Sequence, residues 1–349
     1  MADGSTTVGS SAIDTPTTQR LTIHIGASKT GTSAIQSFLM RNHDWLRKRG
    51  IVVPDVAMGA GSEVDGHQVP YFARPEVDPT RSAAELTRSI EALFTKDGVR
   101  QVVISAENLS DLEPPALRCF DDVVSRYEAE VVIYLRRQDD WLLSVWQQWR
   151  AKVEPDFRAW LDACVGGWGD WRAVLERWER VVGRDRINVR LYERDKLVDG
   201  NVVADFAQFL RVDEVVPDEA PEATVNPSFN EAIVSLIPGS DLFQSENDND
   251  FYDFLDGMLG AAAHKRPNES PITHEERMAI VDRYEESNAW VGERYFADSD
   301  VPSSLFEMPS PDDYRVPSES QLTRQQMQML FRLVFELHKK IDWLRRSLK

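Results

Sequence analysis

Short apolar runs rich in β-branched residues alternate with helical patterns through the first part of the chain. Turn residues bound each run, and apolar side chains recur every three or four positions between the runs. Strands separated by helices pair in parallel through right-handed crossovers. The pattern predicts an α/β fold with a doubly wound parallel sheet flanked by helices. The expected strands are residues 21–25, 101–105, 131–135 and 187–191, with a weaker one at 51–53.

Helices and loops can be placed from the same pattern. One helix is expected from 32 to 49, ending at Gly50, and another from 83 to 95. Residues 59–79 contain glycine and proline with little periodicity, which predicts a loop long enough to have a function. Residues 213–227 are acidic and contain proline, so we expect a surface excursion there.

The end of the chain repeats apolar residues at alternating spacings of three and four. This heptad pattern predicts a helix with one apolar seam. The seam packs on its own domain or, equally well, on a second subunit in a homodimer. Docking on a membrane surface through the basic end of the helix is less favoured. The seam residues are Met327, Leu330, Val334, Leu337, Ile341, Leu344 and Leu348.

These patterns divide the chain into four parts. Residues 1–20 are polar and small, and we expect a disordered tail. The main domain is 21–309, a linker follows at 310–322, and the appended amphipathic, coiled-coil-like C-terminal helix is 323–349. The sequence shows neither an apolar run long enough for a membrane span nor a basic-then-apolar leader, and its two cysteines have no metal or disulfide spacing. We therefore expect a cytoplasmic protein.

The charge of the chain is unevenly distributed. The net charge of −18 argues against non-specific nucleic-acid binding. Residues 323–349 carry seven Lys or Arg and two acidic residues, a net of +5, and subtracting this from −18 leaves −23 for the remainder. An acidic body that binds an anion needs local positive sites. The candidates are Lys29, Arg136, Arg137 and the dipole of a helix.

The most informative stretch is LTIHIGASKTGTSAIQSFLM at 21–40, where a strand runs through a glycine-containing loop directly into a helix. The first N–H groups of such a helix have no intrahelical partner, and the positive end of the helix dipole points the same way. Gly26 and Gly31 allow a ligand to approach the backbone, and Lys29 adds a charge. An anion belongs at this loop.

The position of the lysine distinguishes this loop from the nucleoside-triphosphate loop G-x-x-x-x-G-K-[ST], in which lysine follows the second glycine. Here Lys29 precedes Gly31. A plain strand-to-helix turn is the alternative. The loop resembles the 5′-phosphosulfate loop of the sulfotransferase family, whose donor is 3′-phosphoadenosine 5′-phosphosulfate (PAPS). The resemblance implies that Lys29, Thr30, Gly31, Thr32 and Ser33 bind PAPS, which becomes adenosine 3′,5′-bisphosphate after transfer.

A second stretch, EVVIYLRRQDDWLLSVWQQWR at 130–150, strengthens this resemblance. The family binds the 3′-phosphate of its donor with an arginine at a strand end and a serine eight positions later, and Arg136 and Ser144 match that spacing. Arginine at the carboxyl end of a parallel strand lies where open α/β sheets bind ligands, and it can hold a phosphate bidentately. Tyr192, in NVRLYERDKL, matches a family tyrosine near the donor adenine.

Further stretches resemble bacterial members of the family, including those associated with polysaccharide and other carbohydrate sulfation. Residues 225–230 and 275–306 look like the acceptor-side loop and the C-terminal helices of that subgroup. The resemblance covers roughly residues 21–309. The chain departs from the family in having no late R-K-G-type loop, which in phenol and steroid sulfotransferases adds contacts to the 3′-phosphate. What completes that pocket is left open.

Sulfuryl transfer needs a group that stabilises the leaving phosphate and a base for the acceptor proton. Lys29 suits the first task. Glu107 is the first choice for the base because it directly follows the strand at 101–105; the alternative is that it caps a helix or pairs with an arginine. His67, in the long loop, is the second choice, although a lone loop histidine is often only solvated. No metal is expected, since the transferred group carries a single negative charge.

One histidine and most of the clustered tryptophans are expected to be core residues rather than parts of a site. His24 lies inside the first strand and is expected in the core. Seven of the ten tryptophans fall between 141 and 178, and helical spacing predicts that most are core residues while one or two contact an acceptor.

Residues and resemblance together predict a soluble PAPS-dependent sulfotransferase. The acceptor would offer a hydroxyl or amine on a carbohydrate, a glycolipid or a small natural product, and the acidic body favours a neutral acceptor. Two alternatives remain open. One is a nucleotide-dependent kinase, which the lysine position disfavours. The other is a non-catalytic nucleotide-binding relative that acts through the C-terminal helix.

Overall fold

The computed structural model describes residues 19–59, 61, 64–73, 79–212, 229–260, 269–297 and 304–347. In these residues five strands form one parallel sheet in the order β2-β3-β1-β4-β5. The predicted α/β fold with a parallel sheet is confirmed. The strands are β1 (Arg20–His24), β2 (Ile51–Val52), β3 (Gln101–Ser105), β4 (Glu128–Leu135) and β5 (Ile187–Leu191).

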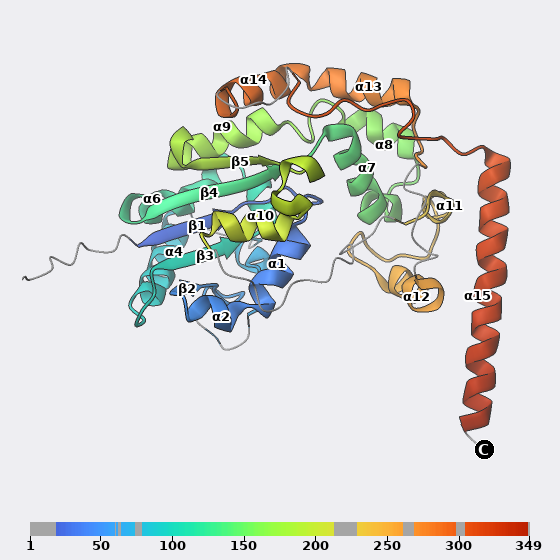
Figure 1. The fold of residues 1–349 in the computed structure, drawn as a ribbon, viewed down its shortest axis with the longest axis horizontal. Helices are drawn as coiled ribbons and strands as arrows, with labels where there is room; N and C mark the ends of the chain where they lie inside the picture. The colour runs from blue at the N-terminus through green and yellow to red at the C-terminus, as the bar shows by residue number, and fades with distance from the viewer. Residues whose placement is uncertain are drawn as a thin grey trace, which may run out of the picture.

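Helices cover both faces of the sheet, and its central strands are therefore buried on both sides. One face carries α4 (Pro79–Phe94), α6 (Asp121–Arg126) and α9 (Trp171–Val182). The other carries α1 (Thr32–Arg41), α2 (His43–Arg47) and α10 (Val202–Phe209). Figure 1 shows this layered arrangement. All five strands therefore end at one edge, where their C-terminal loops meet.

Alternate residues of β1 serve the two faces. Leu21 and Ile23 belong to the core under α4 and α9, whereas the His24 ring lies 5.3 Å from the Phe206 ring of α10. The His24 Nδ1 lies 2.8 Å from Ser105 Oγ, and burial lowers the pKa of His24 to about 3. The prediction that His24 is a core residue is confirmed.

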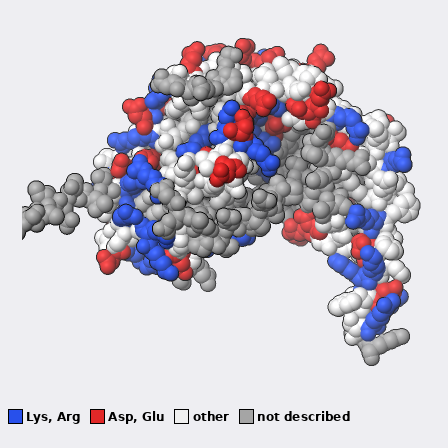
Figure 2. All heavy atoms as spheres, in the orientation of Figure 1, with Lys and Arg blue, Asp and Glu red and all other residues white. Residues whose placement is uncertain are grey.

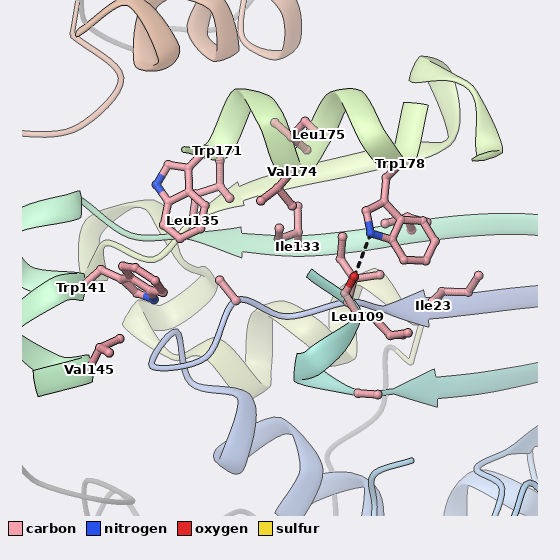
Figure 3. Packing of buried hydrophobic residues seen from close by; sticks show 14 of the residues in the cluster. Ile23, Leu109, Ile133, Leu135, Trp141, Val145, Trp171, Val174, Leu175 and Trp178 are labelled. Atoms are coloured by element: carbon pink, nitrogen blue, oxygen red, sulfur yellow. Dashed lines mark hydrogen bonds between the residues drawn. The ribbon is translucent and has the colours of Figure 1, made fainter. Parts of the chain in front are cut away.

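Five of the seven tryptophans between 141 and 178 are buried in the core, as predicted. In Figure 3 the α9 side chains Trp171, Val174 and Trp178 point toward the strands, and Leu175 of the same helix is also buried. The Trp178 indole N–H donates to the carbonyl of Leu109 at 3.2 Å, so this ring also holds the segment that follows β3. Trp168 is 45% exposed and remains available to a ligand.

The first predicted helix is wrong in one respect. The expected single helix from 32 to 49 is two helices, α1 and α2, separated at Asn42. The Asn42 backbone N–H and side-chain amide both donate to the carbonyl of Phe38, at 3.0 and 3.1 Å. A side-chain amide that competes for backbone hydrogen bonds is unfavourable inside a helix, which accounts for the break.

Short elements connect these layers. The helices among them are α3 (Val69–Phe72), α5 (Pro114–Leu117), α7 (Gln138–Gln148) and α8 (Phe157–Cys164). The 3₁₀ turns are η1 (Glu107–Asp111), η2 (Arg118–Phe120), η3 (Arg150–Lys152), η4 (Arg184–Arg186), η5 (Arg194–Lys196) and η6 (Val198–Gly200).

The C-terminal part of the chain adds α11 (Glu231–Val234), α12 (Asp250–Leu259), α13 (His274–Arg283), α14 (Glu285–Tyr295) and α15 (Glu319–Ser347). α13 packs on α7, and α14 packs on α9. α15 contacts α11 and α12 and stands apart from the sheet (Figure 1). It begins four residues before the predicted position, where Ser318 Oγ accepts from the Gln321 N–H at 3.3 Å and Gln321 Oε1 accepts from the Ser318 N–H at 2.9 Å.

Several predictions lie outside the described residues. They concern the tail at 1–18, the acidic excursion at 213–227, and residues 225–228 of the acceptor-side stretch. Among the helices that the structure describes, none combines the length and apolar character needed to traverse a bilayer.

Candidate anion-binding and transfer site

The loop between β1 and α1 lies at the C-terminal edge of the sheet. Lys29 and Gly31 both adopt positive φ, of 63° and 84°, and Gly31 occupies the N-cap position of α1. Within the described residues no side chain caps this helix end. A helix N-terminus without a side-chain cap can donate its first N–H groups to an anion, so this geometry is compatible with the anion site that the sequence predicts.

Three hydrogen bonds fix the loop from behind. The Thr30 hydroxyl donates to the Ala27 carbonyl at 2.5 Å, the Trp141 indole N–H donates to the Ser28 carbonyl at 2.7 Å, and Arg136 donates to the Lys29 carbonyl at 3.2 Å. The Thr30 side chain is fully buried. Thr30 can therefore offer a ligand its backbone N–H rather than its hydroxyl.

Both loop glycines lie where a side chain would collide. A Cβ at Gly26 would come within 2.6 Å of Thr32 Cγ2. A Cβ at Gly31 would come within 2.8 Å of the Tyr192 ring, and the positive φ of Gly31 is itself unfavourable for other residues. Tyr192 is thus in direct contact with the loop, as a residue near the donor would be.

Lys29 is the cation at the centre of this region. Its Nζ donates to Gln148 Oε1 at 3.3 Å and lies 5.8 Å from the centroid of the Trp149 ring. Burial lowers the pKa of Lys29 to about 8; the charge of Arg136 and that of Lys152 act in the same direction, and Glu107 opposes them. A bound anion would favour the protonated form.

The lowered pKa of Lys29 gives a pH prediction. If the loop binds adenosine 3′,5′-bisphosphate, as the family resemblance implies, the affinity should fall above about pH 8, by up to about tenfold per pH unit, because the anion would bind the protonated lysine. Calorimetric titration across this range measures the effect. Lys29→Arg is the control, since arginine stays charged and should remove the loss. The same pH dependence in both proteins would contradict the role of Lys29.

Arg136 and Ser144 are brought together as their spacing predicted. The Arg136 guanidinium donates to Ser144 Oγ at 2.9 Å, and its Cζ lies 6.0 Å from the centroid of the Tyr192 ring. Arg136 follows β4, and Ser144 lies one turn before the end of α7. With its bond to the Lys29 carbonyl, Arg136 links the loop to a second potential phosphate site.

Glu107 also lies beside the loop. It begins the 3₁₀ turn η1 after β3, and its Oε2 accepts a hydrogen bond from the Thr32 hydroxyl at 2.8 Å. Thr32 is the first residue of α1. The Thr32 hydroxyl therefore holds the carboxylate at the helix end rather than pointing freely at a ligand, while the Ser33 side chain is exposed.

His67 lies near the same edge of the sheet. The adjacent Gln68 donates its backbone N–H to the Ser105 carbonyl at 2.8 Å, and its side-chain oxygen accepts from the Ser105 N–H at 2.8 Å. His67 is half-buried, and its Nδ1 has no hydrogen-bond partner among the described residues. The second-choice base is thus held close to the end of β3.

Arg137 does not serve as a local positive site, contrary to the expectation from sequence. Its guanidinium donates to both carboxylate oxygens of Asp139, at 2.6 and 3.1 Å, and to the Glu307 carbonyl at 2.6 Å. Arg277 donates to Asp139 as well, at 2.6 Å. The positive charge of Arg137 is neutralised in this buried network, which joins α7 to α13.

Three site residues were missed by sequence reasoning. Gln148 and Trp149 contact Lys29, and Lys152 is buried close behind them, with its Nζ donating to Asn249 Oδ1 at 2.8 Å. Gln148 ends α7, Trp149 follows it, and Lys152 ends η3. The alternation of aromatic and polar residues in WQQWRAK was the available signal.

Comparisons with known proteins give limited similarity. No family model matches the chain. An uncharacterized protein from Archaeoglobus fulgidus is 28% identical over 203 residues, which is 56% of this chain and 54% of that protein, so the chain spans about half the length of this relative. A sulfotransferase crystal structure from Alicyclobacillus acidocaldarius aligns with a TM-score of 0.35 and 20% identity, over 58% of this chain and 86% of that one. At these values the function has to be judged from the residues of the site.

Proposed function

We propose that the protein is a PAPS-dependent sulfotransferase. The observation that carries the proposal is the Arg136 guanidinium, which bonds both the Lys29 carbonyl and Ser144 Oγ. It places a second phosphate-binding group directly beside the anion loop. ATP lacks a 3′-phosphate, whereas PAPS carries one on the same ribose as the 5′-phosphosulfate. Two neighbouring anion sites therefore favour PAPS over ATP.

Each end of the donor then has its own residues. The 5′-phosphosulfate lies against the N-terminus of α1, held by Lys29 and the loop N–H groups. Arg136 and Ser144 bind the 3′-phosphate, and Tyr192 packs beside the adenosine. These contacts are the ones that the family resemblance implies.

Transfer breaks the bond between sulfur and the bridging oxygen of the 5′-phosphate and forms a bond from sulfur to an acceptor oxygen. Lys29 stabilises the charge that develops on the leaving phosphate. Glu107 takes the proton of the acceptor hydroxyl, held in place by the Thr32 hydroxyl at 2.8 Å.

An uncharged acceptor fits the surroundings best. Residues 229–260 contain seven acidic residues and no Lys or Arg, and this segment reaches the site through Glu246 and Asn249, which accept hydrogen bonds from Lys152. An anionic polymer would be repelled there. We infer a neutral glycan, a glycolipid or a small hydroxylated natural product as acceptor.

Arg136→Ala tests the donor site. It should weaken binding of adenosine 3′,5′-bisphosphate by about 2 to 5 kcal/mol, because it removes one partner of a buried charge pair. Isothermal calorimetry measures this. Ser144→Ala is the matched variant and should cost less, since it removes one neutral partner. Unchanged affinity in the Arg136 variant would refute the 3′-phosphate site.

Transfer itself is tested with PAPS labelled in its sulfur and a panel of neutral p-nitrophenyl glycosides. The proposal expects label in at least one glycoside and equimolar release of adenosine 3′,5′-bisphosphate. Binding of the bisphosphate without label transfer to any glycoside of the panel would favour the non-catalytic alternative.

A further inference from the structure

One face of α15 is apolar and uncovered. The seam residues Met327, Leu330, Val334, Leu337, Ile341 and Leu344 are each 40–57% exposed. They repeat at spacings of three and four from residue 327 to residue 344 of the helix. Large contiguous apolar patches on soluble proteins mark interaction sites.

The body of the protein contacts a different side of α15. Gln325 is buried, Gln326 donates to the Ala232 carbonyl at 3.2 Å, and Lys340 donates to the Gly257 carbonyl at 3.4 Å. Met329 and Leu333 pack against the core from this side. Packing within the chain, one of the two predicted roles, therefore accounts for one side of the helix and leaves the seam free.

The end of α15 and the segment that packs along this helix, from Gln326 to Lys340, carry opposite charges. Residues 338–347 contain four Lys or Arg and one acidic residue, Asp342. Residues 229–260, which include α11 and α12, contain seven acidic residues and no Lys or Arg. Figure 2 shows basic residues along the projecting helix. The chain thus carries two complementary surfaces that flank one apolar seam.

We propose that the seam binds the same seam of a second copy in an antiparallel, two-fold arrangement. Antiparallel pairing brings the basic end of each α15 toward the start of the other helix, next to the acidic segment of the partner. Parallel pairing would instead place Lys340 opposite Arg345 of the partner subunit, at flanking heptad positions, and juxtapose both basic ends. A two-fold interface also uses the same surface twice, as closed dimers do.

An anionic lipid surface suits this face less well. The acidic segment packs directly against α15, and a negative membrane would repel it. The inference does not depend on the proposed sulfuryl transfer, because none of the seam residues belongs to the donor site.

Light scattering coupled to size-exclusion chromatography tests the interface. The full-length protein should have twice the 39.8 kDa chain mass, and Leu330→Glu combined with Leu337→Glu should reduce it to 39.8 kDa. The matched control is Trp343→Glu, which alters an apolar residue of α15 that is 67% exposed but lies off the seam, and should stay dimeric. A monomeric parent, or a dimer that survives the seam double variant, overturns the proposal.

The orientation has a separate test. Spin labels at Thr323→Cys and, separately, Ser347→Cys lie near opposite ends of the helix, about 36 Å apart along its axis; the native Cys119 and Cys164 are buried. Antiparallel pairing predicts a long distance between the two copies of the label in a dimer at position 323, at position 347, or at both. Short distances at both positions would overturn the proposal. A monomer that sediments with phosphatidylserine vesicles through Leu330 and Leu337 would overturn it as well.

Discussion

Lys29→Ala should lower turnover about 100- to 1,000-fold, the usual effect of removing one group that stabilises developing charge on a leaving oxygen. The fold should be unaffected, because the Lys29 side chain makes one 3.3 Å hydrogen bond, to Gln148, while backbone and neighbouring groups hold the loop. Alanine tolerates the positive φ of this position no worse than lysine does. The measurement is the rate of adenosine 3′,5′-bisphosphate release from PAPS with an active glycoside.

Two variants separate the charge from the rest of the side chain. Lys29→Arg keeps the charge and should retain more activity than Lys29→Ala. Gln148→Ala removes only the partner of Lys29 and should have a small effect. Full activity in Lys29→Ala, with the melting temperature unchanged, would contradict the assignment of the leaving-group site.

Glu107→Gln should lower kcat by about 100-fold or more, because it removes the carboxylate that we propose takes the proton of the acceptor hydroxyl. Donor affinity should change little. Glutamine keeps the shape of glutamate and an oxygen that can accept the Thr32 hydroxyl, so the end of α1 should keep its geometry. Steady-state kinetics and calorimetry on the same protein separate the two effects.

Controls for Glu107 lie in the same region. Asp111→Asn makes the same chemical change four residues later in η1 and should leave kcat nearly unchanged. His67→Ala should cost far less than Glu107→Gln. If His67→Ala is inactive while Glu107→Gln still turns over, the base is His67, and the donor site is unaffected by that outcome.

The sheet was predictable because each strand is a local apolar run bounded by turn residues. β3 and β5 match the prediction at both ends, and β4 begins three residues earlier, at Glu128. The extension depends on a distant partner, since the Glu128 N–H donates to the Gln19 carbonyl at 3.0 Å. The break at Asn42 was missed because the helical pattern of apolar residues continues through it.

The candidate site also has a part that could be predicted from the sequence and a part that could not. The loop at Lys29 and the pair Arg136 and Ser144 could be found because each is a short pattern at the end of one strand. The bond from Thr32 to Glu107 joins residues 75 positions apart, and that from Lys29 to Gln148 joins residues 119 apart. No local pattern contains such contacts. The neutralisation of Arg137 could not be predicted either, because it involves Arg277 and the Glu307 carbonyl, which are also distant in the sequence.

We propose that the loop at Lys29 and the Arg136–Ser144 pair together bind a nucleotide with a 3′-phosphate. The decisive experiment is calorimetric titration of the full-length protein with adenosine 3′,5′-bisphosphate, and separately with ATP and Mg²⁺. We expect one-to-one binding of the bisphosphate, weakened in Arg136→Ala, and much weaker binding of ATP with Mg²⁺. Tighter binding of ATP with Mg²⁺, or no binding of the bisphosphate, would contradict it.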